Sequence, residues 1–200
     1  MLIINYKSIQ KLCKTGNNGN QMNKRPLLLG FLIGLIVLLE QGCDMNDPAK
    51  YETNEPVLTI QEFFNGTVKG YGMIQKRSGE VRRRFVVTME GKWTANEGTL
   101  DEYFVFDDGD KQYRQWKINL IDEHHFTATA SDVKGVAMGE QYGNVIKMSY
   151  KLLIPYNSST VALSMDDWLY RIDKHVVINR ATMKKLGIRV GSITASFFKD

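Results

Sequence analysis

The sequence predicts an all-β domain of about eight to ten antiparallel strands, arranged as a sandwich or a barrel. From Val57 onward, short runs rich in β-branched and aromatic residues recur with turn residues between them. Several runs alternate apolar and polar residues, as Phe85, Val87 and Met89 do with their polar neighbours. This period of two places one face of a strand on a core and the other in water. No long helical pattern competes with these runs.

The expected strands follow one another closely along the chain, as in an antiparallel meander. They cover residues 57–64, 67–76, 80–90, 99–107, 111–121, 125–133, 144–154, 159–172, 175–179 and 190–198. One short helix is expected from Arg180 to Leu186, because Asn179 can cap its first turn and Gly187 can end it. A meander with one short helix before its last strand resembles the lipocalin-type barrel.

The N-terminal part of the chain has the composition of an export signal. Residues 22–42 contain two basic residues, then an apolar run from Pro26 to Leu39, and Gly42 directly before Cys43. A basic start, a short apolar core and a small residue before the cleavage point are typical of such signals. The segment resembles the signal of bacterial lipoproteins, which implies cleavage before Cys43 and a lipid on its thiol. An uncleaved membrane anchor is the alternative.

These features divide the chain into four expected parts. They are an extension before the true start (1–21), a signal peptide (22–42), a flexible polar tether (43–56) and the barrel domain (57–200). The barrel domain is therefore expected in the cell envelope, anchored to a membrane by its lipid and facing the periplasm. Asp44 resembles the retention signal for the inner membrane of enteric bacteria, but the choice between inner and outer membrane stays open.

The exported part of the chain is electrically neutral. The whole chain has a formal net charge of +4, but residues 1–42 contain five of its 26 basic residues and one of its 22 acidic residues. Twenty-one of each therefore remain from Cys43 onward. This balance gives no support for a nucleic-acid partner or for an anionic membrane surface, which would need a clustered basic face. The Arg82–Arg84 run is expected to be a solvated strand edge.

The exported part contains a single cysteine. Because Cys13 lies in the leader and Cys43 is the expected lipidation site, no disulfide can form within the exported domain. The adjacent His124 and His125 cannot hold one ion together on a strand, and His175 stands alone. Neither a metal site nor a cofactor is expected.

The hairpin around Asp107–Asp110 is the best-defined local unit. A turn there aligns the more apolar faces of its two strands, which should point inward. The residues on these faces are Glu102, Phe104, Phe106, Gln112, Arg114, Trp116 and Ile118. Glu102 and Arg114 would then be diagonal neighbours among aromatic rings, close enough to pair.

Two interpretations of this inner face stay open. In the first, it is a ligand site: Arg114 receives a carboxylate or another polar head, and Phe104, Phe106 and Trp116 line an apolar wall. In the second, the ion pair between Arg114 and Glu102 is structural and fixes the register of the hairpin.

Asp167 is the further acidic candidate for the ligand site. Adjacent residues of a strand face opposite ways, so only one of Asp166 and Asp167 can point inward. An enzyme acting on lipid or polyketide-like substrates could use Glu102, Arg114 or Asp167 as acid or base. The sequence offers no nucleophile with a base and an orienting partner for such an enzyme.

Several short motifs carry a resemblance to a known family. They are Leu100–Phe104, Asp108–Gly109, Arg114–Trp116, Asp132–Gly135, Gly143–Asn144, Asp166–Trp168 and Asn179–Arg180. As a set they are similar to a family of proteobacterial lipoproteins defined by domain of unknown function 3833. The resemblance covers essentially the whole exported domain. It implies a lipoprotein with no established catalytic residues and a role connected with lipids.

The sequence thus favours a membrane-tethered barrel that binds or carries a fatty-acyl-like ligand. An eight-stranded barrel can already hold one small ligand. Two alternatives stay open: the enzyme described above, and a structural envelope protein whose barrel is filled by its own side chains.

Overall fold

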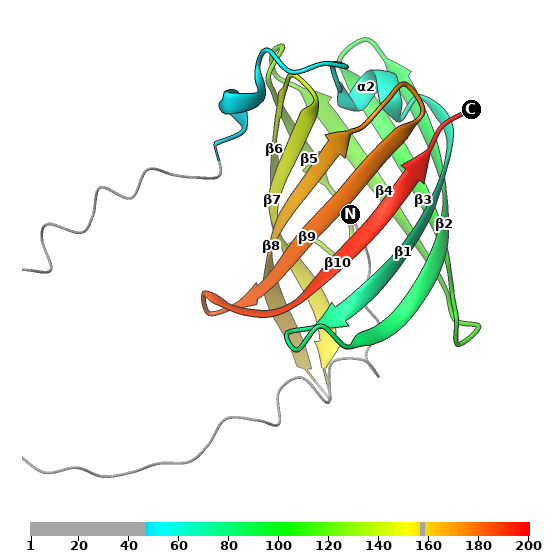
Figure 1. The fold of residues 1–200 in the computed structure, drawn as a ribbon. Coiled ribbons are helices and arrows are strands. Elements are labelled where there is room, and N and C mark those ends of the chain that lie inside the picture. Colours follow the sequence, from blue (N-terminus) through cyan, green and yellow to red (C-terminus); the bar gives the residue numbers. More distant parts are fainter. Residues whose placement is uncertain (1–46, 157–158) are drawn as a thin grey trace, which may run out of the picture.

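The computed structural model describes residues 47–156 and 159–200 (Figure 1). In this part the chain forms one closed barrel, in which consecutive strands pair antiparallel and β1 closes on β10. The strands are β1 (Gly66–Lys76), β2 (Val81–Thr94), β3 (Glu97–Phe106), β4 (Lys111–Leu120), β5 (His125–Thr129), β6 (Ala137–Tyr142), β7 (Val145–Tyr156), β8 (Ser159–Arg171), β9 (Val176–Lys185) and β10 (Ile188–Phe198). The predicted antiparallel barrel is therefore confirmed.

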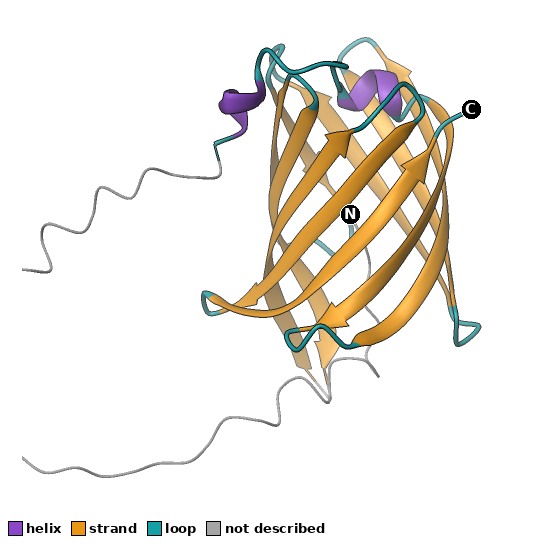
Figure 2. Cartoon of the chain, viewed as in Figure 1, coloured by secondary structure: helices purple, strands orange, loops and turns teal. Residues whose placement is uncertain are grey.

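Two short helices accompany the barrel, and Figure 2 shows both near the same end. The 3-10 helix η2 (Pro48–Tyr51) precedes the α-helix α2 (Ile60–Phe63), which Thr59 caps by accepting a hydrogen bond from the Glu62 backbone N–H. Phe63 is fully buried and the side chain of Gln141 accepts a hydrogen bond from the Ile60 N–H. Helix α2 thus covers one end of the barrel with apolar side chains.

The alternation of the sequence determines which side chains fill the barrel. In β3, every second residue from Gly98 to Phe106 is buried, and the residues between them are partly or fully exposed. The same pattern holds from Ile146 to Ile154 in β7. Because successive side chains of a strand point to opposite faces, the apolar set gathers inside the wall and the polar set faces water.

Glycines on the inner face make room for aromatic rings that lie against the wall. A Cβ atom on Gly139 would lie 2.2 Å from the ring of Phe126, which belongs to the neighbouring strand. A Cβ atom on Gly72 would lie 2.0 Å from the ring of Phe85. The ring of the neighbouring strand therefore occupies the space of the missing side chain in both places.

The helix predicted from Arg180 to Leu186 is wrong. These residues belong mostly to β9, in which Ala181 and Met183 are buried while Arg180 is exposed. The segment pairs with β8 on one side and β10 on the other, and two ladders of backbone hydrogen bonds outweigh a weak local helix signal. Asn179 is not a cap, because its side chain hydrogen-bonds Asp167 inside the barrel.

Two other expected strands also differ from the structure. The segment 57–64, which we expected to be a strand, contains helix α2, and the strand expected at 125–133 ends at Thr129. Strand β6 was not predicted, because glycines at 135, 139 and 143 gave that segment the composition of a turn. The interior position of Gly139 beneath a ring explains why a glycine is tolerated there.

The expected tether is ordered where the structure describes it. Pro48 is buried, and the Tyr51 ring lies 6.3 Å from the Trp168 ring and 6.2 Å from the Tyr170 ring. From Asp47 on, the segment is therefore held against the outer wall. Cys43, the signal segment and the extension fall outside the described residues. Within the part that is described, no helix is long and apolar enough to span a membrane.

Substitution of Gly139 tests the packing of rings against the wall. We expect Gly139→Ala to lower the free energy of unfolding by about 1–3 kcal/mol, because the added methyl group overlaps the Phe126 ring. Chemical denaturation measures the change. Glu140→Ala is the control, and Phe126→Leu should reduce the penalty of Gly139→Ala. Equal penalties with and without the Phe126 ring would contradict this account.

Candidate ligand-binding site

The structure places all six predicted ligand-site residues inside the barrel. None of them exposes more than 3% of its surface, and they come from strands β3, β4 and β8. They are Glu102, Phe104, Phe106, Arg114, Trp116 and Asp167. The buried Arg83 guanidinium lies 3.6 Å from the centre of the Phe106 ring. Most of the inner wall is otherwise apolar, and Glu102, Arg114 and Asp167 form a polar island in it.

Arg114 and Glu102 face each other directly across the β3–β4 ladder. The sequence predicted diagonal neighbours, but the Phe106 N–H donates to the Asp110 carbonyl at the turn, which places Glu102 and Arg114 in direct register. Arg114 Nη1 lies 3.7 Å from Glu102 Oε2, and Trp116 Nε1 donates to the same oxygen at 3.3 Å. The pair therefore lies against an aromatic ring rather than in water.

Asp132 is the second carboxylate at Arg114, and the sequence did not single it out for this role. Its Oδ2 accepts from Arg114 Nε at 3.1 Å and from Nη2 at 2.8 Å. Asp132 lies after β5 in the loop 130–136, which the Leu153 N–H holds by donating to the Asp132 carbonyl. We expected this stretch to be strand. Gly135, with a φ of +73°, lies in the loop but beyond the predicted end of the strand, so it did not indicate a stop at Thr129.

The Arg114–Asp132 contact lies where the wall of the barrel is incomplete. The ladder between β4 and β5 has four pairs, from Lys117 to Leu120 on β4. The rest of β4, Lys111–Trp116, pairs with β3 on one side. On its other side, the described residues provide no strand. Loop 130–136 covers this side, bridged to β7 through Val133 and Leu152. The Asp132 side chain is 20% exposed and that of Arg114 is fully buried, so the ion pair connects the interior with the surface.

A second polar group lies close to the first on the inner face. Asp167 accepts from the Tyr150 hydroxyl at 3.2 Å and from the side-chain amide of Asn179, which also donates to the Trp168 carbonyl. The Tyr150 ring meets the Trp116 ring edge-on, with 5.4 Å between centroids. Tyr150 thus links the Asp167 group to the Arg114 group. The roles of Tyr150 and Asn179 were not predicted from the sequence.

Burial controls the protonation of the polar island. Removal from water raises the pKa of Glu102 to about 7, although Arg114 and the Trp116 hydrogen bond act in the opposite direction. Burial also disfavours the charged form of Arg114, but Glu102 and Asp132 outweigh it and the pKa of the guanidinium is raised. Burial, with the charge of Asp167, raises the pKa of Tyr150 well above its usual value. Near neutral pH the island thus holds a charged guanidinium, a half-protonated Glu102 and a neutral phenol.

Three polar atoms of this island have no hydrogen-bond partner among the described residues. They are Arg114 Nη1, Asp132 Oδ1 and Asn179 Oδ1. A buried donor or acceptor without a partner costs about 1–3 kcal/mol, so such atoms are usually satisfied by water or by a bound molecule. One donor and two acceptors are therefore available to a polar group inside the barrel.

The histidines lie away from this island. His125 Nδ1 lies 2.8 Å from Asp122 Oδ1, and the His124 ring stacks on the Tyr142 ring with 4.3 Å between centroids. Both belong to the outer part of the barrel end near α2. Across the described ranges 47–156 and 159–200, no group of three or more histidine, cysteine, aspartate or glutamate residues is placed to hold a metal ion.

A closed antiparallel barrel with a polar island inside an apolar wall is a lipocalin-like fold. Its sequence matches, over residues 37–199, the family described as "Protein of unknown function (DUF3833)", and the chain belongs to this family. Among solved structures it is similar to the S-type phycobiliprotein lyase CPES from Guillardia theta, with a TM-score of 0.53 and 9% sequence identity. The similarity covers 72% of this chain and 93% of that one, and it concerns the fold alone. No curated protein matches the sequence.

Replacement of Glu102 by glutamine tests the raised pKa. The pKa of Glu102 is about 7 in the folded protein against 4.5 for the ordinary group, so between these values the folded state keeps a proton that the unfolded state releases. Stability therefore falls as the pH rises through this window. Glutamine does not ionise, so the Glu102→Gln variant keeps its stability as the pH rises. We expect its free energy of unfolding to exceed that of the parent by roughly 3 kcal/mol at pH 8 and to equal it near pH 4.

Thermal or chemical unfolding at several pH values measures this difference. Glu90→Gln, on the exposed outer face of β2, is the matched control and should show no such dependence. A gain for Glu102→Gln that stays the same at every pH would contradict a raised pKa at this site.

Proposed function

We propose that the barrel binds an apolar ligand of fatty-acyl type, whose polar group meets Arg114, Glu102 and Asp132. The observation that carries this proposal is the set of buried polar atoms without hydrogen-bond partners beside a mostly apolar interior. A protein that needs only a packed core has no use for a charged guanidinium there, because removing it from water is expensive. A ligand that supplies the missing hydrogen bonds would offset part of this expense.

The walls of the barrel suit an acyl chain. Phe104, Phe106, Trp116 and their neighbours present an apolar lining, and a barrel of ten strands is wider than the eight-stranded barrels that hold one small ligand. The aromatic rings that fill the spaces above Gly72 and Gly139 lie against the wall rather than toward the axis. Similarity in fold to a phycobiliprotein lyase supports a barrel that handles a ligand.

The charge balance of the polar island decides which polar group it accepts. Arg114 already faces two carboxylates, so an ionised ligand carboxylate would be the third negative group around a single positive one. A hydroxyl, ester or amide adds no charge and can both donate and accept. The site therefore favours an uncharged acyl compound over a free fatty acid, and this preference should weaken below pH 7, where Glu102 holds its proton.

The incomplete wall between β4 and loop 130–136 is the proposed route for the ligand. The ladder between β4 and β5 covers only Lys117–Leu120, so a loop rather than a strand covers the first part of β4. Loops open more readily than paired strands. Asp132 lies in this loop, so an outward movement of the loop would also withdraw one partner of Arg114.

Native mass spectrometry of the purified protein tests ligand binding, with 1-hexadecanol and palmitic acid as probes. We expect both to bind at pH 6, and palmitic acid to bind more weakly at pH 8. Arg114→Met should weaken 1-hexadecanol binding by roughly ten- to a hundredfold, as expected for the loss of a buried hydrogen bond to a charged group. Arg180→Met, an exposed arginine on the outer face of β9, is the control.

The outcome separates the ligand site from the structural ion pair. If Arg114→Met remains folded and binds both probes like the parent, the Glu102–Arg114 pair only fixes the register of β3 and β4. A protein that neither carries nor takes up any lipid would favour the barrel filled by its own side chains.

We further propose that Cys43 carries the lipid anchor of the mature protein. Three residues lie between Cys43 and Asp47, which caps helix η2, and Pro48 is the first buried residue of the described segment. Cys43→Ser should abolish incorporation of radiolabelled palmitate in bacterial cells and release the protein from the membrane fraction, whereas Cys13→Ser should change neither. Palmitate labelling that persists in Cys43→Ser would contradict the lipid anchor, and membrane association without labelling would favour the uncleaved segment.

A further inference from the structure

The end of the barrel opposite to α2 brings two hairpins together. The β1–β2 hairpin and the β9–β10 hairpin lie side by side there, because β1 pairs with β10 and the Arg77 N–H donates to the Val190 carbonyl at 3.1 Å (Figure 1). Their turns extend beyond the ladder. We call the residues of these two tips, 76–82 and 184–189, the basic end.

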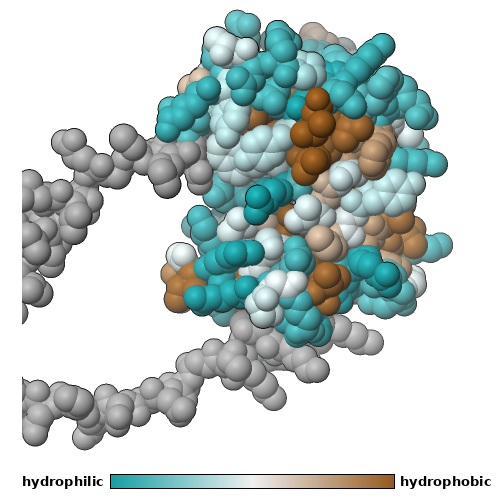
Figure 3. Space-filling view, in the orientation of Figure 1, coloured by the Kyte–Doolittle hydropathy of each residue, from teal (hydrophilic) through white to brown (hydrophobic). Residues whose placement is uncertain are grey.

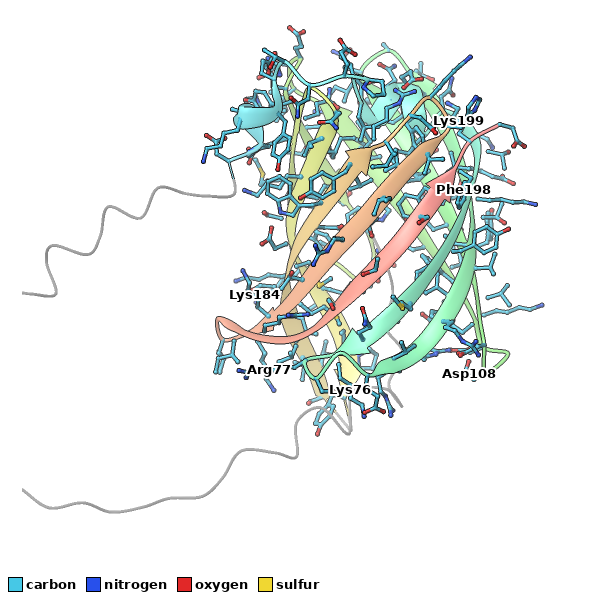
Figure 4. The ribbon with its side chains drawn as sticks, in the orientation of Figure 1. Lys76, Arg77, Asp108, Lys184, Phe198 and Lys199 are labelled. Carbon is cyan, nitrogen blue, oxygen red and sulfur yellow. The ribbon has the colours of Figure 1, made fainter. Side chains whose placement is uncertain are left out.

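The basic end concentrates positive charge that the overall composition hides. It contains six basic residues and one acidic residue, Glu80, which pairs with Lys76. Lys76, Arg77 and Lys184 appear together at this end in Figure 4. Lys184 lies 3.6 Å from Asp166, so after both pairs are counted an excess of positive charge remains. The neutral balance of the exported domain gave no sign of this cluster, because the two tips are far apart in the sequence.

The acidic turn nearby does not neutralise the basic end. Asp108 and Asp110 are bound by Arg83, whose Nη2 lies 2.6 Å and 3.2 Å from their carboxylates. Asp107 is bound by Arg84 at 3.1 Å. Two guanidiniums thus bind three carboxylates, which leaves one negative charge in this corner of the barrel, and Figure 4 places Asp108 apart from the labelled lysines.

Aliphatic side chains project from the same tips. Leu186 exposes 94% of its surface, Ile188 58% and Val81 45%. In Figure 3, brown atoms at the lower left edge mark the β9–β10 tip, with hydrophilic atoms beside them. Exposed aliphatic groups surrounded by basic ones are the combination by which proteins insert into the surface of a membrane.

The fold itself does not explain Leu186. Its backbone φ is +50° and that of Gly187 is +80°, as in the two-residue hairpin turns that favour asparagine followed by glycine. A leucine is strained in this left-handed region, and its side chain is almost wholly exposed. Leu186 therefore lowers the stability of the turn without contributing to packing.

We propose that the basic end docks on a bilayer that contains anionic phospholipid. Leu186 and Ile188 enter the boundary between head groups and acyl chains, while Lys184, Lys185 and Arg77 contact lipid phosphates. Each basic residue near such a surface adds attraction, and buried aliphatic groups add to it. A second copy of the chain is a poor partner, because it would bring two positive ends together.

This proposal is independent of the ligand proposed for the barrel interior. It concerns the outer tips of the molecule, and its test needs no ligand but rests on the anchor proposed at Cys43. A protein that does not enter the first vesicles contradicts that anchor, whereas an anchored protein that captures no anionic vesicles contradicts the docking. The segment that begins at Asp47 lies at the other end of the barrel, so an anchored protein could present the basic end to a second membrane (Figure 1). A docking assay should therefore supply two kinds of vesicle.

Capture of a second vesicle tests the proposal on the full chain. The protein is reconstituted into phosphatidylcholine vesicles, and fluorescent vesicles of either phosphatidylcholine alone or phosphatidylcholine with phosphatidylglycerol are added. We expect capture of the vesicles that contain phosphatidylglycerol, at least several-fold above the neutral ones, and its loss in high salt. No capture of anionic vesicles, or equal capture of both kinds, would overturn the proposal.

Matched variants separate the tip from general surface charge. Lys184→Glu with Lys185→Glu should reduce capture on the order of tenfold or more, and Lys69→Glu with Lys92→Glu, elsewhere on the outer wall, should not. Leu186→Asn should leave the melting temperature unchanged or raise it, because asparagine suits the turn, and should still reduce capture several-fold. Full capture by Leu186→Asn, or a large loss of its stability, would show that Leu186 serves the fold instead.

Discussion

The guanidinium of Arg114 is the group on which the interior of the barrel depends. It is fully buried and lies between Glu102 on the neighbouring strand and Asp132 on a loop. The carboxylates offset part of the cost of a charge at this depth, and without Arg114 the buried Glu102 and the partly exposed Asp132 would lose their common cation. The pair with Glu102 aligns β3 with β4, and the pair with Asp132 holds loop 130–136 against the wall. One side chain thus connects the register, the covering of the wall and the electrostatics of the site.

The alternation of the sequence was sufficient to predict the barrel and the inward face of its best hairpin. Glu102, Phe104, Arg114 and Trp116 could be assigned to the interior because a period of two leaves a strand only two faces. The pairing of Arg114 with Asp132 could not be predicted in this way, since it joins a strand to a loop that folds across the end of a different ladder. Such contacts depend on where strands end, and no glycine or proline in the sequence marks the end of β5 at Thr129.

The wrong helix at Arg180–Leu186 and the missed β6 have a common physical cause. Local signals, such as a potential cap at Asn179 and a glycine-rich composition around Gly139, were contradicted by tertiary contacts. Asn179 is required inside the barrel by Asp167, and Gly139 is required by the Phe126 ring. The local propensities of such residues are misleading, because a contact inside the barrel determines the residue type. Asn179 belongs to the polar island, and Gly139 lies in the wall of the barrel.

The two ladders of β5, with four pairs to β4 and four pairs to β6, make the barrel mechanically uneven. The β7–β8 ladder has twelve pairs and β2–β3 has ten, so most of the wall can open only with the whole domain. Thermal fluctuations will concentrate at the two short ladders on either side of β5, where few amide groups must separate at once. A barrel whose other ladders are longer can open along β5 on a timescale much shorter than that of global unfolding.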